Sequence, residues 1–350
     1  MIDLEQVKSN NAFDPDSYSV TSLVLVLGLA FIIFFSAFSY LLIQNINNSP
    51  QLLAVSGVNP VEAKQPRDSR ASEEFIDKKE QEKKKKEKQQ PELKPGVEIK
   101  KDWEAESILV RDHKTGKILL SKNADKQHPL ASITKLMSAM VLLDNGIDWS
   151  ERISVTNKDI PESMVDSGES YSKTNLWTAS LVGSSNKSMY SLVEDLEWPL
   201  QAFIQRMNKK AQNMGMTDTY FVDTTGLDKN SVSTARDISI LLREAMKHKK
   251  IQKALTTDQV KIRPKNEEDM HHIWNTNWLL LGWIPNKFEK IYGGKTGHIE
   301  AAGYNFTVQV SDQKGHVLDV VVLGTKSHEA RFKVAQKAAR WVFENYDWPK

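Results

Sequence analysis

The longest unbroken apolar stretch of the chain lies close to its N-terminus. From Val20 to Ile43 the sequence reads VTSLVLVLGLAFIIFFSAFSYLLI and contains no charged residue. About 20 apolar residues in a helix cross the roughly 30 Å hydrocarbon core of a bilayer. The stretch is longer than the apolar part of a signal peptide and has no basic segment directly before it. It therefore predicts a transmembrane anchor over residues 20–43.

The basic residues around this stretch indicate its orientation. Lys8 precedes it, and the next basic residue after it is Lys64. Lysine and arginine close to a membrane span are enriched on the cytoplasmic side. We therefore expect residues 1–19 to be a cytoplasmic N-terminal segment and the chain after the anchor to be extracytoplasmic, in a single-pass protein of the cell membrane.

Residues 44–102 carry few apolar side chains. Their first part is punctuated by Asn, Ser and Pro, and the mixed charge run EEFIDKKEQEKKKKEKQQPELKPG follows. Such a composition does not bury enough apolar surface to offset the entropy of ordering the chain. We predict a flexible charged tether here. Binding of Lys83 to Lys86 to an anionic polymer or lipid is the alternative that the sequence leaves open.

Residues 103–350 have the patterning of one globular domain. Short apolar segments predict strands at residues 107–111, 117–121, 291–296, 304–310 and 317–323. PLASITKLMSAMVLLD, residues 129–144, predicts a buried helix, further helical patterns follow, and an amphipathic helix ends the chain. Strands at both ends with helices between them predict an α+β fold, in which an antiparallel sheet with flanking helices carries an inserted helical lobe. A cleft between sheet and lobe is the expected site.

The overall composition limits the chemistry that this domain can perform. The 350 residues contain no cysteine, which excludes disulfides, thiolate metal sites and a thiol nucleophile. The formal charge of +2 is nearly balanced and indicates no nucleic-acid partner. The eight histidines show no metal-binding spacing, so we expect surface histidines, no metal and no cofactor. Covalent chemistry must then use oxygen or nitrogen.

A serine and a lysine stand near the start of the predicted buried helix. Ser132 and Lys135 are three residues apart, so a helix places them on one face and the amine can reach the hydroxyl. Burial lowers the pKa of a lysine and makes it a usable base. Unpaired backbone N–H groups at a helix start suit a developing oxyanion. Three other S-x-x-K matches occur, but only Ser132 opens a buried-type helix.

Two further motifs follow in the chain. Ser184-Ser185-Asn186 falls in the predicted lobe, and Lys295-Thr296-Gly297 stands at the end of a predicted strand. S-x-x-K, S-x-N and K-T-G together mark class A β-lactamases and penicillin-binding proteins. Residues 106–346 resemble the serine D-Ala-D-Ala carboxypeptidases, the low-molecular-mass penicillin-binding proteins of peptidase family S11. Besides the three motifs, the resemblance includes longer segments such as DHKTGKILLSKNADKQHPLASITKLM and GGKTGHIEAAGYNF.

The resemblance implies a role for each residue of the first two motifs. Ser132 would be the acylated nucleophile and Lys135 its base. Ser184 would relay a proton to or from the leaving amine. Asn186 would hold the substrate's amide and help to position Lys135.

The K-T-G motif would hold the end of the substrate. Lys295 and Thr296, beside Gly297, would bind the terminal carboxylate of a D-Ala-D-Ala peptide, since a cation next to a hydroxyl suits that group. The backbone N–H groups of Ser132 and His298 would form the oxyanion hole. The resemblance implies no metal and no cofactor.

The implied function is that of a membrane-anchored serine D-alanyl-D-alanine carboxypeptidase of peptidoglycan stem peptides, with β-lactams as acylating inhibitors. The alternatives are a DD-endopeptidase of cross-links, a catalytically silent cell-wall-binding scaffold of the same fold, and a β-lactamase, which the missing E-x-x-L-N motif disfavours. Most tryptophans in or near the lobe and cleft are expected in the core, while one or two are candidates for lining a groove for a sugar-bearing substrate.

Overall fold

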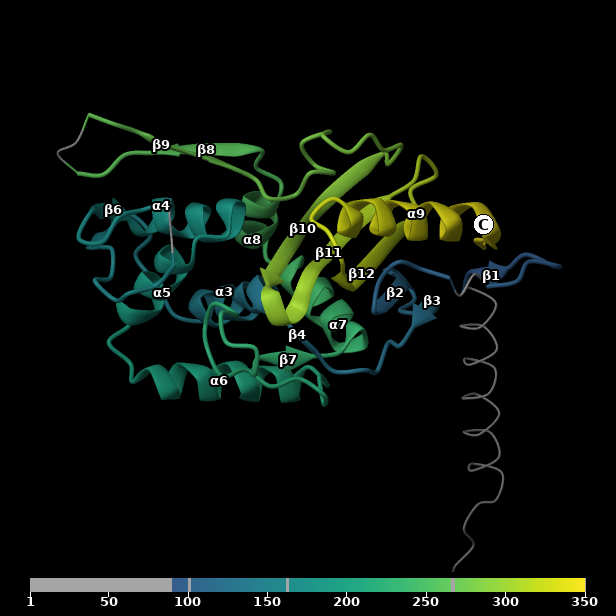
Figure 1. Cartoon of the computed structure of the whole chain (residues 1–350), viewed down its shortest axis with the longest axis horizontal. Coiled ribbons are helices and arrows are strands. Elements are labelled where there is room, and N and C mark those ends of the chain that lie inside the picture. Colours follow the sequence, from purple (N-terminus) through teal and green to yellow (C-terminus); the bar gives the residue numbers. More distant parts are fainter. Residues whose placement is uncertain (1–89, 100–101, 162–163, 266–267, 350) are drawn as a thin grey trace, which may run out of the picture. The chain divides into compact units, whose positions relative to one another are not determined.

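The computed structural model describes residues 90–99, 102–161, 164–265 and 268–349 (Figure 1). The predicted N-terminal segment, the predicted anchor and most of the predicted tether lie outside the described residues. Within the described ranges, no helix combines the length and the apolar character needed to cross a membrane. The described residues are those of the predicted globular domain and the end of the tether.

Strands lie at both ends of the described chain and helices fill its middle. The strands are β1 (Glu92–Leu93), β2 (Ser107–Asp112), β3 (Ile118–Lys122), β4 (His128–Pro129), β5 (Arg152–Ser154), β6 (Ser170–Ser172), β7 (Val232–Ser233), β8 (Gln259–Ile262), β9 (His271–Trp274), β10 (Lys290–Ile299), β11 (Gly303–Ser311), β12 (Val317–Thr325) and β13 (Tyr346–Asp347). The α-helices are α3 (Thr134–Leu143), α4 (Lys173–Thr178), α5 (Asn186–Glu194), α6 (Leu200–Asn213), α7 (Ala235–Ala245), α8 (Lys249–Leu255) and α9 (Ala330–Asn345). Short turns of 3-10 helix, η1 (Ala131–Ile133) and η3 (Glu300–Ala302), and of π-helix, η2 (Ala179–Gly183), complete the order.

The central sheet has five antiparallel strands in the order β10-β11-β12-β2-β3. This order joins the last strands of the chain to its first hairpin and makes β10 an edge strand. The predicted α+β fold with an antiparallel sheet is therefore confirmed. The prediction placed K-T-G at the end of a strand, and this is wrong, because β10 continues to Ile299 and pairs Thr296 with Phe306 and Gly297 with Asn305. Backbone pairing extends this strand past its apolar residues.

Helices cover both faces of the sheet, α9 on one face and α7 on the other (Figure 1). Alternate residues of β2 enter different cores. Ile108 and Val110 pack with Phe332 of α9, whereas Leu109 joins the core that α3 and α7 share. Successive side chains of a strand point to opposite faces, so a strand buried on both faces reads as a continuous apolar run.

The helical lobe contains α3 to α6 and lies beyond the β10 edge of the sheet (Figure 1). Its central helix is α3, in which every residue from Thr134 to Leu142 is buried. The sequence predicted a helix from residue 129, but residues 128–129 pair with β7 as strand β4 and η1 precedes α3. The start was misplaced because the apolar pattern continues through this turn.

The last part of the predicted tether packs on the domain. Leu93 pairs with Tyr346 in the two-stranded ladder β1–β13, and the Lys94 N–H donates to the Asn345 carbonyl (3.0 Å). Lys117 Nζ donates to the carbonyl of Pro91 (2.8 Å). The folded domain thus begins before residue 103. Composition does not reveal this, because backbone hydrogen bonds and a single apolar side chain, Leu93, which packs against the core beside α9, hold the segment.

Candidate active site

Ser132 lies in the η1 turn directly before α3. The preceding residue, Ala131, has φ = 49°, a left-handed conformation that residues other than glycine seldom adopt. Asn305 of β11 holds this turn, because its Nδ2 donates to the carbonyl oxygens of Pro129 (2.8 Å) and Leu130 (3.3 Å). Backbone strain of this kind gathers at functional sites. The two hydrogen bonds from Asn305 fix the position of Ser132 relative to the sheet.

Lys135 is fully buried, and three oxygens from different parts of the chain surround its amine. Nζ lies 2.8 Å from Ser132 Oγ, 2.6 Å from Asn186 Oδ1 and 3.0 Å from the Thr225 carbonyl oxygen. The first distance is that of a nucleophile and its base. The other two contacts hold the amine in place. The sequence predicted the contacts with Ser132 and Asn186 and missed Thr225, which lies 90 residues away along the chain.

The S-x-N motif follows the π-helical turn η2. Ser184 has φ = 70°, again a left-handed conformation, and Ser185 begins α5 by accepting a hydrogen bond from the Ser188 N–H (3.1 Å). These two constraints direct Ser184 toward β10 and Asn186 toward α3, where they contact the two lysines of the site. A π-turn next to a strained residue is a feature of functional sites.

Lys295 is buried in the interior of β10. Its Nζ donates to Ser184 Oγ (2.8 Å) and to the Thr296 carbonyl (3.1 Å). Burial, and then the positive charges of Lys135 and Arg331, hold the pKa of Lys295 well below its usual value. Two buried amines in one site disfavour the state in which both are protonated. The folded chain therefore favours Lys295 as a neutral amine.

Thr296 and His298 occupy the same face of β10. Thr296 Oγ1 donates to Thr276 Oγ1 (2.7 Å), and the exposed His298 ring stacks on Tyr304 with centroids 4.1 Å apart. The structure thus brings the predicted residues of all three motifs to one site. Thr276 belongs to none of the three motifs and was not predicted from the sequence; it lies in the segment NTNWLL, residues 275–280.

Gly297 lies where β10 passes closest to the nucleophile. A Cβ on this residue would lie 2.8 Å from the Leu130 carbonyl oxygen and 3.3 Å from the Ser132 backbone nitrogen. Only glycine allows the strand to come this near without a shift. The close approach sets the distance between the two proposed oxyanion donors, the N–H groups of Ser132 and His298.

We expect Gly297→Ala to slow acylation by a labelled penicillin by about 10²-fold or more, because the added methyl group pushes the two oxyanion donors apart. The rate of adduct formation on a folded variant measures this. Gly146→Ala is the control, since nothing lies within 4 Å of its added Cβ. Equal acylation rates for Gly297→Ala and the natural chain would contradict the prediction.

Arg331, in the first turn of α9, supports β10 from behind the cleft. Its Nη1 donates to the Gly297 carbonyl (3.3 Å), and burial lowers the pKa of the guanidinium to about 10. The guanidinium also lies over the Tyr304 ring, 5.5 Å from its centroid. Arg331 belongs to no motif, so the sequence analysis missed it.

His328, one turn before Arg331, is expected to make the stability depend on pH. Burial, and then the charge of Arg331, lower the pKa of His328 from 6.5 to about 4. The unfolded chain takes up this proton near pH 6.5 and the folded chain only near pH 4, so its contribution to stability is complete above pH 6.5 and is lost as the pH falls toward 4.

We expect the melting temperature of His328→Phe to change less than that of the natural chain across this pH range. Thermal melts at several pH values would measure it, with the exposed His272→Phe as control. A parallel pH dependence in His328→Phe and the natural chain would show that other groups determine acid stability.

One histidine departs from the surface position expected of it. His128 is buried, with Nε2 lying 2.8 Å from the Ala302 carbonyl oxygen. Asp166, Glu169 and His271 bring one ligand atom each within 4.8 Å of one another. Hydrogen bonds already link them, since the Asp166 N–H donates to Glu169 Oε2 (2.7 Å) and His271 Nε2 lies 3.2 Å from Glu169 Oε1. These bonds tie strand β9 to the lobe.

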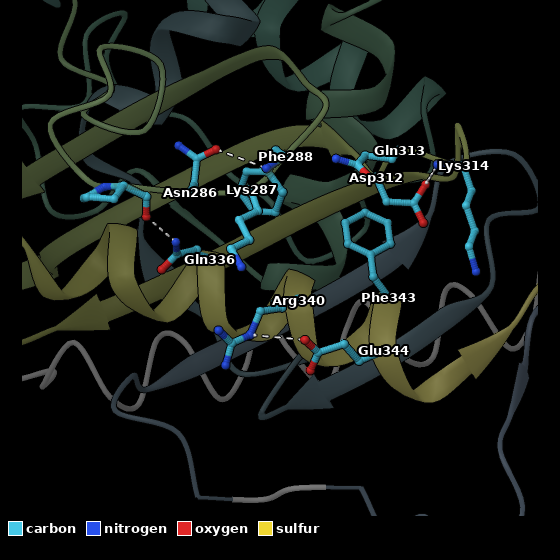
Figure 2. Close-up of a pocket in the computed structure, with 11 residues that line it drawn as sticks. Asn286, Lys287, Phe288, Asp312, Gln313, Lys314, Gln336, Arg340, Phe343 and Glu344 are labelled. Carbon is cyan, nitrogen blue, oxygen red and sulfur yellow. Dashed lines mark hydrogen bonds and ion pairs between the residues drawn. The ribbon is translucent and has the colours of Figure 1, made fainter.

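Two hollows of similar size differ in whether they adjoin the strand that carries the K-T-G motif. One, of about 500 Å³, is lined by Phe288, Phe343, Arg340 and Glu344 among others (Figure 2). It contains no residue of the three motifs, and Arg340 and Glu344 pair with each other (3.5 Å). The other, an open hollow of about 530 Å³, adjoins the end of β10. Its lining is Leu227, Asp228, Lys229, Ile299, Glu300 and Ala301.

Comparison with known proteins agrees with this geometry. The family model described as D-alanyl-D-alanine carboxypeptidase, Peptidase S11, matches residues 89–327. A D-alanyl-D-alanine endopeptidase of Pseudomonas aeruginosa is 32% identical over 257 residues, which are 72% of this chain and 81% of that protein. The D-alanyl-D-alanine carboxypeptidase DacF of Bacillus subtilis is 27% identical over 254 residues, 70% of this chain and 63% of that protein.

A solved structure also resembles the chain. Penicillin-binding protein D2 from Listeria monocytogenes, in its cefotaxime-bound form, superposes with a TM-score of 0.60 and 26% identity, over 71% of this chain and 100% of that one. The arrangement of sheet and lobe is therefore that of a penicillin-binding protein.

Proposed function

The chain belongs to the Peptidase S11 family of serine D-Ala-D-Ala peptidases, and we propose that it cleaves peptidoglycan stem peptides through an acyl-enzyme on Ser132. The observation that carries the proposal is the buried Lys135 amine 2.8 Å from the Oγ of Ser132, which follows the left-handed residue Ala131 in the turn before α3.

The proposed acylation uses each part of the cleft. Ser132 Oγ attacks the carbonyl carbon of the penultimate D-Ala while Lys135 takes its proton, and the N–H groups of Ser132 and His298 stabilise the oxyanion. Ser184 Oγ accepts a hydrogen bond from Lys295, so its own proton is directed elsewhere and can pass to the leaving amine. The proton that Lys135 took from Ser132 is passed on to Ser184, which ends the step as a neutral hydroxyl. The C–N bond then breaks, and water later releases the acyl group.

Two leaving groups fit this chemistry. In the carboxypeptidase reaction, which the sequence analysis ranked first, it is a terminal D-Ala; in the endopeptidase reaction it is the amine of a second, cross-linked stem peptide. The 32% identity to an endopeptidase, against 27% to a carboxypeptidase, favours the second reaction. The family model is described as a D-alanyl-D-alanine carboxypeptidase, so the carboxypeptidase reaction remains the other candidate.

The experiment is a competition between two substrates. Purified full-length chain is incubated with an equimolar mixture of a pentapeptide and a cross-linked dimer of stem peptides, and the products are separated by chromatography. Monomers formed from the dimer would establish the endopeptidase reaction, and release of D-Ala alone would establish the carboxypeptidase. If the folded chain cleaves neither substrate, the catalytically silent cell-wall-binding scaffold is the remaining function.

We also propose that residues 20–43 anchor the protein in the cell membrane, with the catalytic domain extracytoplasmic. The proposal rests on an uncharged run of membrane-spanning length. Cell fractionation of the full chain and of a chain lacking residues 1–43, with protease accessibility in intact cells, tests both points. Release of the full chain by a carbonate wash would exclude the anchor.

A further inference from the structure

A row of aromatic and imidazole rings leads from the end of β9 to the end of β10. The row consists of Trp274, Trp283, Trp278, His328, Tyr304 and His298. The centroid distances between successive rings are 5.9, 5.6, 4.2, 5.9 and 4.1 Å. Since His298 ends the row and its N–H is a proposed oxyanion donor, the row is continuous with the candidate active site.

The two tryptophans at the far end of the row are exposed. Trp274 and Trp283 leave 45% and 52% of their surface accessible, although they are among the largest apolar side chains. A lone exposed tryptophan needs no explanation, but two in contact, in a row of rings that reaches the candidate active site, form an apolar patch of the kind that binds ligands.

The segment that carries these rings is held in a fixed conformation. Asn277 Oδ1 accepts from the N–H groups of Leu279 (3.1 Å) and Leu280 (3.3 Å), and the Ile284 N–H donates to the Trp278 carbonyl (3.2 Å). Gly282, with φ = 72°, turns the chain back so that Trp283 contacts Trp278. Trp278 in turn stacks on Phe332 of α9, with centroids 5.7 Å apart. A surface ordered in this way binds without a further ordering cost.

The exposed pair lies on the carboxylate-binding side of the cleft. Trp274 is two residues from Thr276, whose hydroxyl accepts the hydrogen bond of Thr296. Two extended residues span about 7 Å. Thr296 is proposed to hold the carboxylate of the departing peptide, so the departing part of the substrate passes close to Trp274.

We propose that Trp274 and Trp283 form a stacking subsite for a sugar ring of the glycan strand attached to the leaving stem peptide. A pyranose presents an apolar C–H face and a polar rim. An indole offers the matching apolar face with an N–H at its edge. Polar groups border the pair, since the His272 ring lies 4.9 Å from that of Trp274 and contacts Gln259.

The length of the leaving group fits this placement. About three residues separate a cross-link from the sugar, and extended they reach about 10 Å, enough to carry the sugar from Thr296 past Trp274. A single departing D-Ala carries no sugar. The subsite, which rests on the proposed function for its choice of ligand, therefore serves cross-linked substrates.

Kinetics on matched substrates test the proposal. A cross-linked dimer carrying its disaccharides is compared with the same dimer after enzymatic removal of the sugars, using the full chain, Trp274→Ala, Trp283→Ala and the double variant. We expect the double variant to raise KM about 10-fold for the sugar-bearing dimer only, with kcat unchanged. Leu200→Ala, an exposed apolar residue of α6, is the control.

A binding measurement separates this proposal from the proposed function. Peptide-free glycan strands are titrated into Ser132→Ala by calorimetry, with and without the two tryptophan substitutions. If the glycan strands bind and the tryptophan substitutions abolish this binding, the sugar subsite is supported. This holds even if penicillin fails to acylate Ser132 in the natural chain, because that failure would count only against the proposed peptidase activity. Absent binding, or an equal rise of KM for both dimers, would overturn the sugar subsite.

Discussion

Ser132→Ala is expected to abolish the adduct that a labelled penicillin forms with the full chain, and to lower peptidase turnover by at least about 10⁴-fold. The adduct is an ester of the Ser132 hydroxyl, so no other oxygen in the cleft replaces it. The fold should persist, because Lys135 keeps its contacts with Asn186 and Thr225. Intact mass spectrometry measures the adduct, and a thermal melt checks the fold.

The chain provides a matched control for this substitution. Ser170 also begins an S-x-x-K sequence, but it lies in β6, and its lysine, Lys173, pairs with Glu151 and Asp195 (2.5 Å each). Ser170→Ala should therefore acylate as fast as the natural chain. A penicillin adduct that still forms on Ser132→Ala would show that another residue is the nucleophile, and the proposed function would then lose its basis.

The motif residues could be predicted from the sequence because some of their contacts join residues that are close together in the chain. A spacing of three residues brings Ser132 and Lys135 together in any helical turn, so the 3-10 turn that replaces the expected helix start leaves the contact intact. The order of the three motifs then identified Ser184, Asn186 and Lys295 as candidates. The antiparallel sheet followed from short apolar segments at both ends of the domain.

The supporting contacts could not be read in the same way. Thr225, Thr276 and Arg331 touch the motif residues through a backbone carbonyl, a hydroxyl and a guanidinium group respectively, from positions 20 to 90 residues away along the chain. No pattern of apolar residues encodes such contacts, which arise only when the strands and the lobe meet. For the same reason the sequence suggested tryptophans near a groove but not which two are exposed together.

Lys295→Met is expected to change activity and stability in opposite directions. Loss of the Lys295 amine should lower kcat/KM by about 10²–10³-fold, the usual effect of removing one preorganised hydrogen-bond donor of an active site. Stability should rise, because burial holds the pKa of Lys295 well below that of an unfolded lysine, and methionine removes a buried amine while filling similar space. Activity assays and thermal melts on the same preparation measure both.

The sign of the pH effect follows from the lowered pKa of Lys295. Between that pKa and about 10.4 the unfolded chain binds a proton that the folded chain lacks, so stability rises with pH in this window. The stabilisation by Lys295→Met should be largest at low pH and vanish near pH 10.4. Lys290→Met, at the exposed start of the same strand, should change neither stability nor activity.

The substrate supplies a second control on the role of Lys295. If its amine binds the terminal carboxylate, replacing that carboxylate by an amide should weaken turnover by the natural chain and have little additional effect on Lys295→Met. Equal losses in both proteins would show that Lys295 acts on Ser184 rather than on the substrate, since Ser184 Oγ is its nearest partner (2.8 Å). In either case the reaction requires a buried amine that destabilises the fold, which is the trade-off expected where activity depends on a destabilised active site.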